Sequence, residues 1–287
     1  MNKEDIKREF ILLNAGHACH NADWNWKNVC SPFVRIHYVV NGTAKIIRGD
    51  GVYELKENHL YLTPSYIKHT YKCDGILELF YLHIYEDLGK NPSIFELINF
   101  PTEIMADPLI VKLIKRLIEI NPGGELQYYD PRSYDNSVML AGNIARQKNA
   151  PIAYELETQG ILMQIISKFL VKAEYKNDHI EKRILKSLRY IHKNIDQTVD
   201  INSLAELCCL TKDHFIRLFK KEMNCTPGKY INRKKIESAQ LKLLINDMTI
   251  KDIAYNLGFE NISYFNRLFK KLTGESPGNY KKKIQPR

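Results

Sequence analysis

The sequence lacks any long hydrophobic run. No apolar stretch reaches the roughly 18–20 residues that a membrane-spanning helix needs. The N-terminus, MNKEDIKREF, is charged and has no apolar core of a secretory signal peptide. The six cysteines form no Cys-x-x-Cys pair and follow no regular spacing. These absences predict a cytoplasmic protein with reduced thiols and without membrane contact. We expect the adjacent Cys208 and Cys209 to be small, buried side chains of a helix.

Excess positive charge is absent from the first two thirds of the chain. The net charge is +9 at pH 7, yet residues 1–180 contain 20 Lys and Arg against 22 Asp and Glu. Residues 181–287 contain 22 Lys and Arg against 11 Asp and Glu. Such a concentration is typical of a domain that binds a polyanion, although a solvated lysine-rich surface gives the same count.

What the sequence does contain is a repeat near its C-terminus. Residues 214–230 read HFIRLFKKEMNCTPGKY, residues 264–280 read YFNRLFKKLTGESPGNY, and nine of the seventeen aligned positions are identical. A repeat of this kind is one supersecondary unit used twice. With 287 residues, the chain is long enough to place this pair in a domain separate from an N-terminal one.

Residues 33–86 have the pattern of antiparallel β structure. Short runs rich in β-branched and aromatic residues alternate with turn signals such as the Asn-Gly pair at 41–42. Strands of this length and spacing indicate a small barrel or a sandwich. Residues 1–32 give weak signals apart from Trp24 and Trp26, which alternate and are expected either to be buried or to line a ligand pocket.

Residues 101–176 change to a helical pattern. Apolar residues at a 3-4 spacing predict helices over 104–120, over 137–147 and from Pro151 through Lys176. The last helix is more apolar than one core-facing stripe requires, so we expect it to pack on the barrel and on a second copy of the chain. A short polar segment, 177–183, is the predicted linker to the basic domain.

Each copy of the repeat has the pattern of a helix-turn-helix, at about 201–222 and at about 250–272. A short helix carries a small residue, Ala205 or Ala254, where a partner helix must cross closely. A turn and a second helix follow. The apolar stripes of the two second helices are expected to face the core and consist of Phe215, Leu218 and Phe219 in one copy and Phe265, Leu268 and Phe269 in the other.

Residues 184–283 resemble the DNA-binding domain of the AraC/XylS family of bacterial transcription regulators. The resemblance rests on LAELCCLTKDHFIRLFKK, TPGKYINRKKIESAQLKLL and TIKDIAYNLGFENISYFNRLFKKLTGESPGNYK, in the order of that domain. It implies that both recognition helices enter successive major-groove segments on one face of double-stranded DNA. The base contacts it implies come from Asp213, Ile216, Arg217, Ile262, Ser263, Asn266 and Arg267. The phosphate contacts come from Lys212, Lys220, Lys221, Lys270 and Lys271.

Residues 1–176 resemble, more loosely, the cupin-like sensor domain of the same family, with HYVVNGTAKI, ENHLYLTPSYIKHTYK and ELFYLHIY in corresponding order. Cupin enzymes hold a metal through a His-x-His pair, and the sequence contains no such pair. We therefore expect no metal, no cofactor and no catalytic residue. The histidines are either hydrogen-bonded core residues or part of a small-molecule pocket. The candidate pocket residues are Trp24, Trp26, Arg35, His37, His69, Tyr81 and His83, a set that suits a sugar.

The sequence thus predicts an α+β protein of two domains, with an N-terminal cupin-like β-barrel and packed helices followed by an all-α double helix-turn-helix domain. We expect a homodimeric, sequence-specific regulator of transcription, an activator that responds to a small molecule and works with RNA polymerase. Two alternatives stay open. The N-terminal domain only dimerises, or it is a metal-dependent cupin enzyme fused to a DNA-binding domain.

Overall fold

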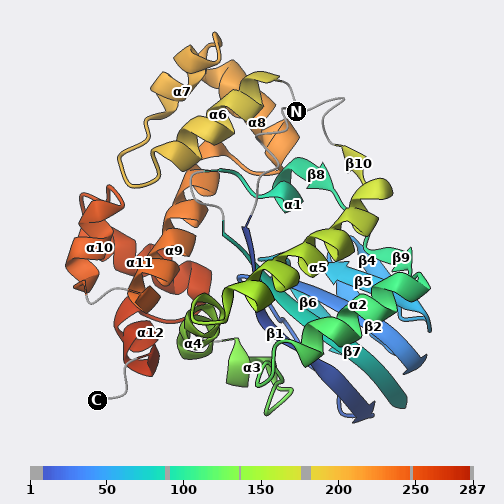
Figure 1. Cartoon of the computed structure of the whole chain (residues 1–287). Helices are drawn as coiled ribbons and strands as arrows, with labels where there is room; N and C mark the ends of the chain where they lie inside the picture. Colours follow the sequence, from blue (N-terminus) through green and yellow to red (C-terminus); the bar gives the residue numbers. More distant parts are fainter. Residues whose placement is uncertain (1–8, 88–90, 136, 176–181, 246–247, 285–287) are drawn as a thin grey trace. The chain divides into compact units, whose positions relative to one another are not determined.

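The chain folds into two compact units in the computed structural model, which describes residues 9–87, 91–135, 137–175, 182–245 and 248–284. The barrel unit comprises residues 9–87 and 98–175, and the helical unit comprises residues 91–97 and 182–284 (Figure 1). Of the predicted linker, 177–183, residues 177–181 lie outside the described residues, and Lys182 and Arg183 belong to a helix rather than to a linker. Each unit is described below by itself.

Two of the three antiparallel sheets in the described part of the barrel unit enclose its core. Alternation of inward and outward residues at period 2 gives each sheet one face for a shared core. This arrangement confirms the predicted fold class for the N-terminal part. The five-stranded sheet has the order β1 (Glu9–Asn21), β7 (Ile76–Asp87), β2 (Val34–Gly42), β5 (His59–Thr63) and β9 (Glu103–Met105). The three-stranded sheet has the order β4 (Gly51–Glu54), β3 (Lys45–Arg48) and β6 (His69–Lys72).

The core of the barrel unit lies between the two sheets. Val39 and Leu79 from the larger sheet belong to one buried cluster with Ile46 from the smaller one. Trp24 is buried in the same cluster, and Trp26 packs against it. Both tryptophans therefore meet one core, although the segment that holds them is not a strand.

Strand β1 is a feature that sequence patterns did not predict. Nine of its thirteen residues are buried, but they include polar and small residues that weaken any strand signal. Gly16 shows why a small residue stands there, because a Cβ at this position would meet the hydroxyl of Tyr81 at 2.3 Å. The glycine thus leaves room for the hydroxyl end of Tyr81, on a neighbouring strand, to approach the backbone.

Helices α2 (Pro108–Glu119), α4 (Ser137–Lys148) and α5 (Ile152–Val171) lie along the five-stranded sheet (Figure 1). The helix predicted over 104–120 begins later, because Ile104 belongs to β9 and Asp107 caps the helix by accepting a hydrogen bond from the Ile110 amide. The predicted 137–147 helix is present as α4. The helix predicted to reach Lys176 ends at Val171. Residues beyond it form β10 (Glu174–Tyr175), which pairs with β8 (Ile98–Asn99).

The helical unit contains two helix-turn-helices joined by one long helix, as expected (Figure 1). The first consists of α7 (Ile201–Leu207) and α8 (Lys212–Met223), and the second of α10 (Ile250–Asn256) and α11 (Ile262–Thr273). Proline in the first turn suits a helix start, and it begins both of the helices that follow the copies. The remaining helices of this unit are α1 (Ile94–Leu97), α6 (Lys182–Lys193), α9 (Pro227–Ile245) and α12 (Pro277–Ile284).

The two turns differ by one residue. Helices α7 and α10 begin 49 residues apart, whereas α8 and α11 begin 50 residues apart, so the second turn is longer. Each turn has one residue with positive φ, Cys209 at 53° and Gly258 at 66°. This geometry corrects our expectation for the cysteine pair, since Cys208 is buried and Cys209, in the turn, is exposed.

Candidate DNA interface and candidate ligand chamber

The recognition helices α8 and α11 are anchored by the same aromatic arrangement. Phe215 and Phe219 are fully buried with ring centroids 5.6 Å apart, and Tyr230 of α9 meets Phe219 edge-on at 5.6 Å. In the second copy Phe265 and Phe269 are also fully buried, and the tyrosine of α12 meets Phe269 edge-on. These rings are core residues, so the opposite side of each helix is left for a partner.

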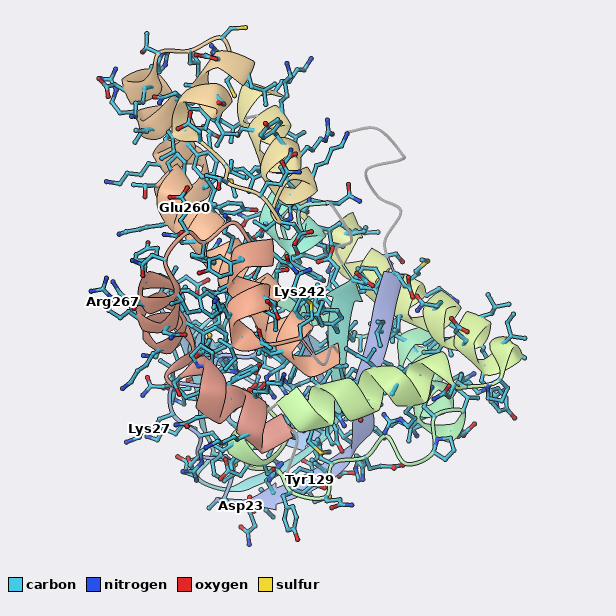
Figure 2. The ribbon with its side chains drawn as sticks, turned by 90° about the vertical axis from the view of Figure 1, so that its left-hand side faces the viewer. Asp23, Lys27, Tyr129, Lys242, Glu260 and Arg267 are labelled. Carbon is cyan, nitrogen blue, oxygen red and sulfur yellow. The ribbon has the colours of Figure 1, made fainter. Side chains whose placement is uncertain are left out.

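The outward sides of α8 and α11 carry the residues predicted to contact DNA. Among the predicted base-contacting residues, Ile216 and Ile262 are half-buried, and Ile262 packs against the core of the second copy. Figure 2 shows Arg267 projecting from α11. The exposed members of the predicted base-contacting set are Asp213, Arg217, Ser263, Asn266 and Arg267. The predicted phosphate-contacting residues, Lys212, Lys220, Lys221, Lys270 and Lys271, are all exposed.

The two helix-turn-helices are held in a fixed relation within the helical unit. Gly258 lies so close to the backbone before α7 that a Cβ would be 2.6 Å from the carbonyl carbon of Gln197. Asn232 of α9 donates a hydrogen bond of 2.9 Å to the hydroxyl of Tyr264 on α11. A hollow of about 370 Å³ lies between the copies. The spacing of α8 and α11 is therefore set by backbone contact and by α9.

A second constellation lies inside the barrel unit, where two rows of residues cross the larger sheet. Cross-strand register places Arg35 of β2 between Thr63 of β5 and His83 of β7. Two residues further along β2, His37 stands beside Tyr81 of β7. Strand period 2 puts both rows on one face. The register therefore brings four of the predicted pocket residues onto one face of the sheet, Arg35, His37, Tyr81 and His83.

Arg35 is the centre of the polar network in this interior. Its side chain is 1% exposed and donates to Tyr134 Oη at 2.8 Å and to Asp135 Oδ2 at 3.0 Å. Ser31 Oγ accepts from Arg35 Nε at 3.1 Å and donates to Asp135. Burial raises the pKa of Asp135, and the guanidinium acts against that shift. When Asp135 is ionised, this buried pair has no net charge.

Hydrogen bonding fixes the tautomers of two buried histidines. His69 Nδ1 lies 2.8 Å from the Ile67 carbonyl, which can only accept, so Nδ1 carries the proton. Burial lowers the pKa of His69 to about 4, and the neutral ring therefore presents Nε2 as an acceptor. For His83 the order is reversed. Its Nε2 accepts from Arg35 at 3.0 Å, which leaves Nδ1–H as the donor.

The two atoms that these histidines present, His69 Nε2 and His83 Nδ1, have no hydrogen-bond partner among the described residues. The same holds for His37 Nδ1 and Thr63 Oγ1, although each of these atoms is buried. Burial, followed by the charge of Arg35, lowers the pKa of both His37 and His83, so both rings are neutral. An unpartnered buried polar atom is costly, by about 1–3 kcal/mol. Several unpartnered polar atoms on one inner face indicate an interior suited to binding a polar ligand.

Aromatic rings complete this interior. Trp24 stacks on Tyr71 with centroids 3.9 Å apart, and His37 meets the Trp24 ring edge-on at 5.4 Å. His69 stands edge-on to Tyr71 at 4.7 Å. We call Trp24, Arg35, His37, Thr63, His69, Tyr71, Tyr81 and His83 the inner cluster.

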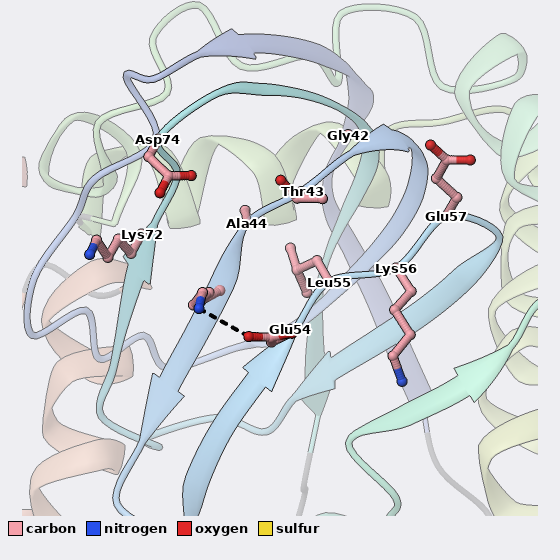
Figure 3. A pocket seen from close by; sticks show the side chains of 10 residues that line it. Gly42, Thr43, Ala44, Glu54, Leu55, Lys56, Glu57, Lys72 and Asp74 are labelled. Atoms are coloured by element: carbon pink, nitrogen blue, oxygen red, sulfur yellow. Dashed lines mark hydrogen bonds and ion pairs between the residues drawn. The ribbon is translucent and has the colours of Figure 1, made fainter.

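Two hollows open on the barrel unit, and only one adjoins the inner cluster. The hollow in Figure 3 has about 570 Å³ and is lined by charged residues such as Lys45 and Glu54, which form an ion pair of 3.0 Å. The other has about 470 Å³ and is lined by Trp26 and Asp135 among others. Trp26 Nε1 and Asp135 Oδ1 are buried and lack partners among the described residues. This second hollow is therefore the better candidate for an entrance.

Six of the seven residues predicted for a ligand pocket are brought together in the inner cluster, and Trp26 lines the hollow beside it. Sequence reasoning missed Ser31, Thr63, Tyr71, Tyr134 and Asp135. Strand alternation could have found Thr63 and Tyr71, because they share strands with inward-facing neighbours. No sequence signal placed Tyr134 and Asp135 against Arg35, since they come from a short segment about 100 residues away.

Metal-ligating side chains gather elsewhere. Within the described part of the chain, His17, Cys19 and Glu78 form the one set of three whose ligand atoms all lie within 4.8 Å of one another. These residues lie on β1 and β7 and are exposed or half-exposed, outside the inner cluster. His37, His69 and His83 form no such set. Among the described helices, none has both the length and the apolar character that crossing a membrane requires.

Comparison with known proteins assigns a family to each half. Residues 204–283 match the family described as a helix-turn-helix domain, and residues 14–129 match the AraC-like ligand binding domain. An uncharacterised HTH-type transcriptional regulator of Bacillus subtilis, YfiF, is 26% identical over 87% of this chain and 76% of its own length. The Msm operon regulatory protein of Streptococcus mutans is 21% identical over 87% and 84%. The arabinose operon regulatory protein of Escherichia coli is 30% identical over 36% and 35%.

Proposed function

The chain belongs to the AraC family of transcriptional regulators, and we propose that it activates transcription at specific promoters when a small uncharged polar molecule occupies the barrel. The observation that carries the DNA half of this proposal is the pair of matched recognition helices with exposed Arg217 and Arg267. Arginine is the commonest reader of guanine in the major groove. A dimeric activator of this design acts on RNA polymerase beside its site.

The DNA half is tested by mapping bound genomic fragments and then measuring affinity for one of them by fluorescence anisotropy. Arg217→Ala and Arg267→Ala should each weaken binding by about 1–3 kcal/mol and relax the preference at one base pair. Arg132→Ala is the matched control, since Arg132 is an exposed arginine of the barrel unit. Unchanged affinity in both helix variants would refute the assigned face.

The character of the inner cluster supports an uncharged, hydroxyl-rich ligand. Its one cation, Arg35, already has a carboxylate partner, so a second anion would find no free positive charge. What stays available is an acceptor at His69 Nε2 and a donor at His83 Nδ1, beside the stacked pair of Trp24 and Tyr71. Hydroxyl groups can both donate and accept, and sugar rings pack on aromatic faces. A sugar fits these features better than a carboxylate or a phosphate.

The ligand half is tested by a thermal-shift panel of neutral sugars, with matched carboxylates such as sugar acids for comparison. A ligand that binds only the folded state must raise the melting temperature. His69→Asn keeps a donor near the Ile67 carbonyl and removes the Nε2 acceptor. His59→Asn is the matched control, because His59 Nδ1 makes the same contact to the carbonyl two residues before it. The shift should vanish in the first variant only. A response to the acids alone would exclude the proposed class.

A second candidate role for the barrel unit is dimerisation, and α5 supplies the observation. Ile152, Leu156, Met163 and Val171 are 47–82% exposed and fall within one stripe of the helix. Gly160 lies in the same stripe, and a Cβ there would meet no atom. Large apolar residues around a small one suit close helix pairing. Leu156→Lys should convert a dimer into a monomer in light scattering, whereas Ile76→Lys, at an exposed strand position, should not.

A further inference from the structure

A short segment departs from the barrel unit and belongs to the helical unit. The chain follows β7 to Asp87, contributes residues 91–97 to the helical unit, and returns to the barrel unit at Ile98. This segment includes α1 and is separated from α9 by more than 120 residues of sequence. Ile94 and Leu97 are buried, and Glu96 between them makes polar contacts with α9.

Glu96 meets three side chains of α9. Tyr230 Oη donates to Glu96 Oε2 at 2.8 Å, and Lys234 Nζ lies 2.9 Å from Glu96 Oε1. Arg233 Nη2 is 3.4 Å from the same Oε1. The tyrosine hydroxyl is also 2.8 Å from His192 Nε2 of α6. One carboxylate thus joins α1 to α9 and, through Tyr230, to α6.

The ionised form of Glu96 is strongly favoured. Burial alone would raise its pKa, but the charges of Lys234 and Arg233 outweigh burial and hold the pKa at about 2. Burial, and then the charge of Glu96, raise the pKa of Tyr230, so the hydroxyl keeps its proton and donates it. Lys234 is 6% exposed, and removing its carboxylate partner would leave a buried cation with only Glu237 beside it.

The two ends of this connection lie in the two candidate functional sites. On one side, β7 carries Tyr81 and His83 of the inner cluster and runs directly into the segment. On the other side, Tyr230 packs against Phe219, the core residue of recognition helix α8. Glu96 is therefore only thirteen residues beyond His83 along the chain, and residues 88–90 between them lie outside the described part.

From these contacts we propose that Glu96 couples the barrel unit to DNA binding, with residues 91–97 as the connecting segment and the α9 surface of Tyr230, Arg233 and Lys234 as its receptor. The proposal rests on the function proposed above. A ligand-induced shift of β7 would act on residues 91–97, and Glu96 of this segment is bound to α9, the helix that follows the first helix-turn-helix. By thermodynamic reciprocity, DNA bound to the helical unit must then stabilise the barrel unit.

The tryptophans offer a direct measurement of this reciprocity. Trp24 and Trp26 are the only tryptophans of the chain, and both belong to the barrel unit. Their fluorescence during urea unfolding therefore reports on the barrel unit alone. The probe is a mixed-sequence DNA duplex at low salt, whose binding is followed separately by anisotropy. At a duplex concentration of about 100 times the dissociation constant, the unfolding constant of a fully coupled barrel falls by up to about 100-fold.

Two variants and one control separate coupling from simple structural support. Glu96→Gln removes the carboxylate, and an insertion of four Gly and Ser residues between Asp87 and Asn91 slackens the connection while leaving Glu96 in place. Glu103→Gln is the control, because Glu103 pairs with Lys56 at the surface of the barrel unit. In wild type and in the control, the duplex should move the tryptophan transition to higher urea. In both test variants the duplex should bind without moving it.

The outcomes are distinguishable. A wild-type transition that stays fixed although anisotropy shows bound duplex overturns the coupling and leaves the DNA-binding function standing. A shift that persists undiminished in Glu96→Gln and in the insertion variant also overturns it. If the wild type binds no duplex even at low salt, the proposed function fails and the coupling with it. If the shift is lost in the two test variants and kept in the wild type and the control, the result supports the role assigned to Glu96.

Discussion

The two helix-turn-helices share their aromatic core and differ in what surrounds the tyrosine that follows each recognition helix. Tyr230 is fully buried, and its hydroxyl contacts both Glu96 and His192. The corresponding Tyr280 is half-buried, and its hydroxyl accepts from the neutral Gln240 at 3.2 Å. The tyrosine of the first copy therefore belongs to a buried ionic network, whereas the hydrogen bond from Gln240 to Tyr280 joins two neutral side chains.

This difference indicates that identical residues at matching positions of a repeat can have different roles. The core rings stabilise both copies in the same manner, and the tyrosine of the first copy is also joined to Glu96, 134 residues away in the sequence. Differences between the copies in the polar contacts of matching residues thus indicate where another part of the chain can influence one helix-turn-helix and not the other. The following tests weaken one copy at a time and ask whether the other responds.

The largest effect is expected at the turns. Gly258→Ala should destabilise the helical unit by about 3 kcal/mol or more, because positive φ disfavours alanine and its Cβ would be 2.6 Å from Gln197. Cys209→Ala, at the matching turn, should change stability by less than about 1 kcal/mol, since the side chain is exposed. Urea unfolding followed by circular dichroism measures both. Equal losses would show that the two turns do not differ as described.

Acid should weaken the first copy selectively. The pKa of Glu96 is lowered from its ordinary value of 4.5 to about 2. A lowered carboxyl pKa gives stability that is complete above about pH 4.5 and is lost as the pH falls towards 2, on the order of 3 kcal/mol. Hydrogen exchange should therefore accelerate in α8 and the start of α9 over this range before it does in α11. Simultaneous loss in both copies would argue against a special role for Glu96.

Removing each tyrosine hydroxyl gives a smaller effect with a clear direction. Tyr230→Phe removes the hydroxyl that contacts both Glu96 and His192 and should cost about 1–3 kcal/mol. Tyr280→Phe removes one partly exposed hydrogen bond, and about 0.5–1.5 kcal/mol is expected. The difference between the two midpoints in urea is the quantity to compare. A larger loss for Tyr280→Phe would reverse the comparison drawn above.

The smallest effects are expected where the copies are alike. Lys221→Ala and Lys271→Ala should each reduce the salt dependence of DNA binding by about one phosphate contact, across all sequences tested. Anisotropy titrations at several salt concentrations measure this slope. If one lysine changes the slope and the other does not, only one copy holds the DNA backbone as proposed.

Local patterns predicted much of the fold because the relevant signals were local. The strands of 33–86, the helices α4 and α9 and both helix-turn-helices follow from periodicity, turn residues and proline positions. Strand β1 did not, since burial on both faces and its small residues hide alternation. Ile104 was included in the helix predicted over 104–120, yet pairing with β5 places it in β9. Tertiary pairing outweighed the local pattern there.

The candidate ligand site was predictable only in part, and the reason is the distance along the chain. Strand period alone could place Arg35 and His37 on one face of β2, whereas His83 joins them through the pairing of β2 with β7. Their partners Tyr134 and Asp135 come from a short helical turn, and nothing in the sequence indicates that this turn covers the guanidinium. Glu96 was missed for the same reason, since its partners lie more than 130 residues away.

The segment of residues 91–97 has a practical consequence for dissection of the protein. A fragment that begins at Lys182 contains both helix-turn-helices but lacks Glu96, so Lys234 would be left to Glu237 alone. Such a fragment is not the helical unit but the helical unit with one piece removed. A peptide spanning residues 91–97 should bind the fragment in trans and raise its melting temperature. Because the helical unit combines two separate stretches of sequence, no single truncation yields the complete unit.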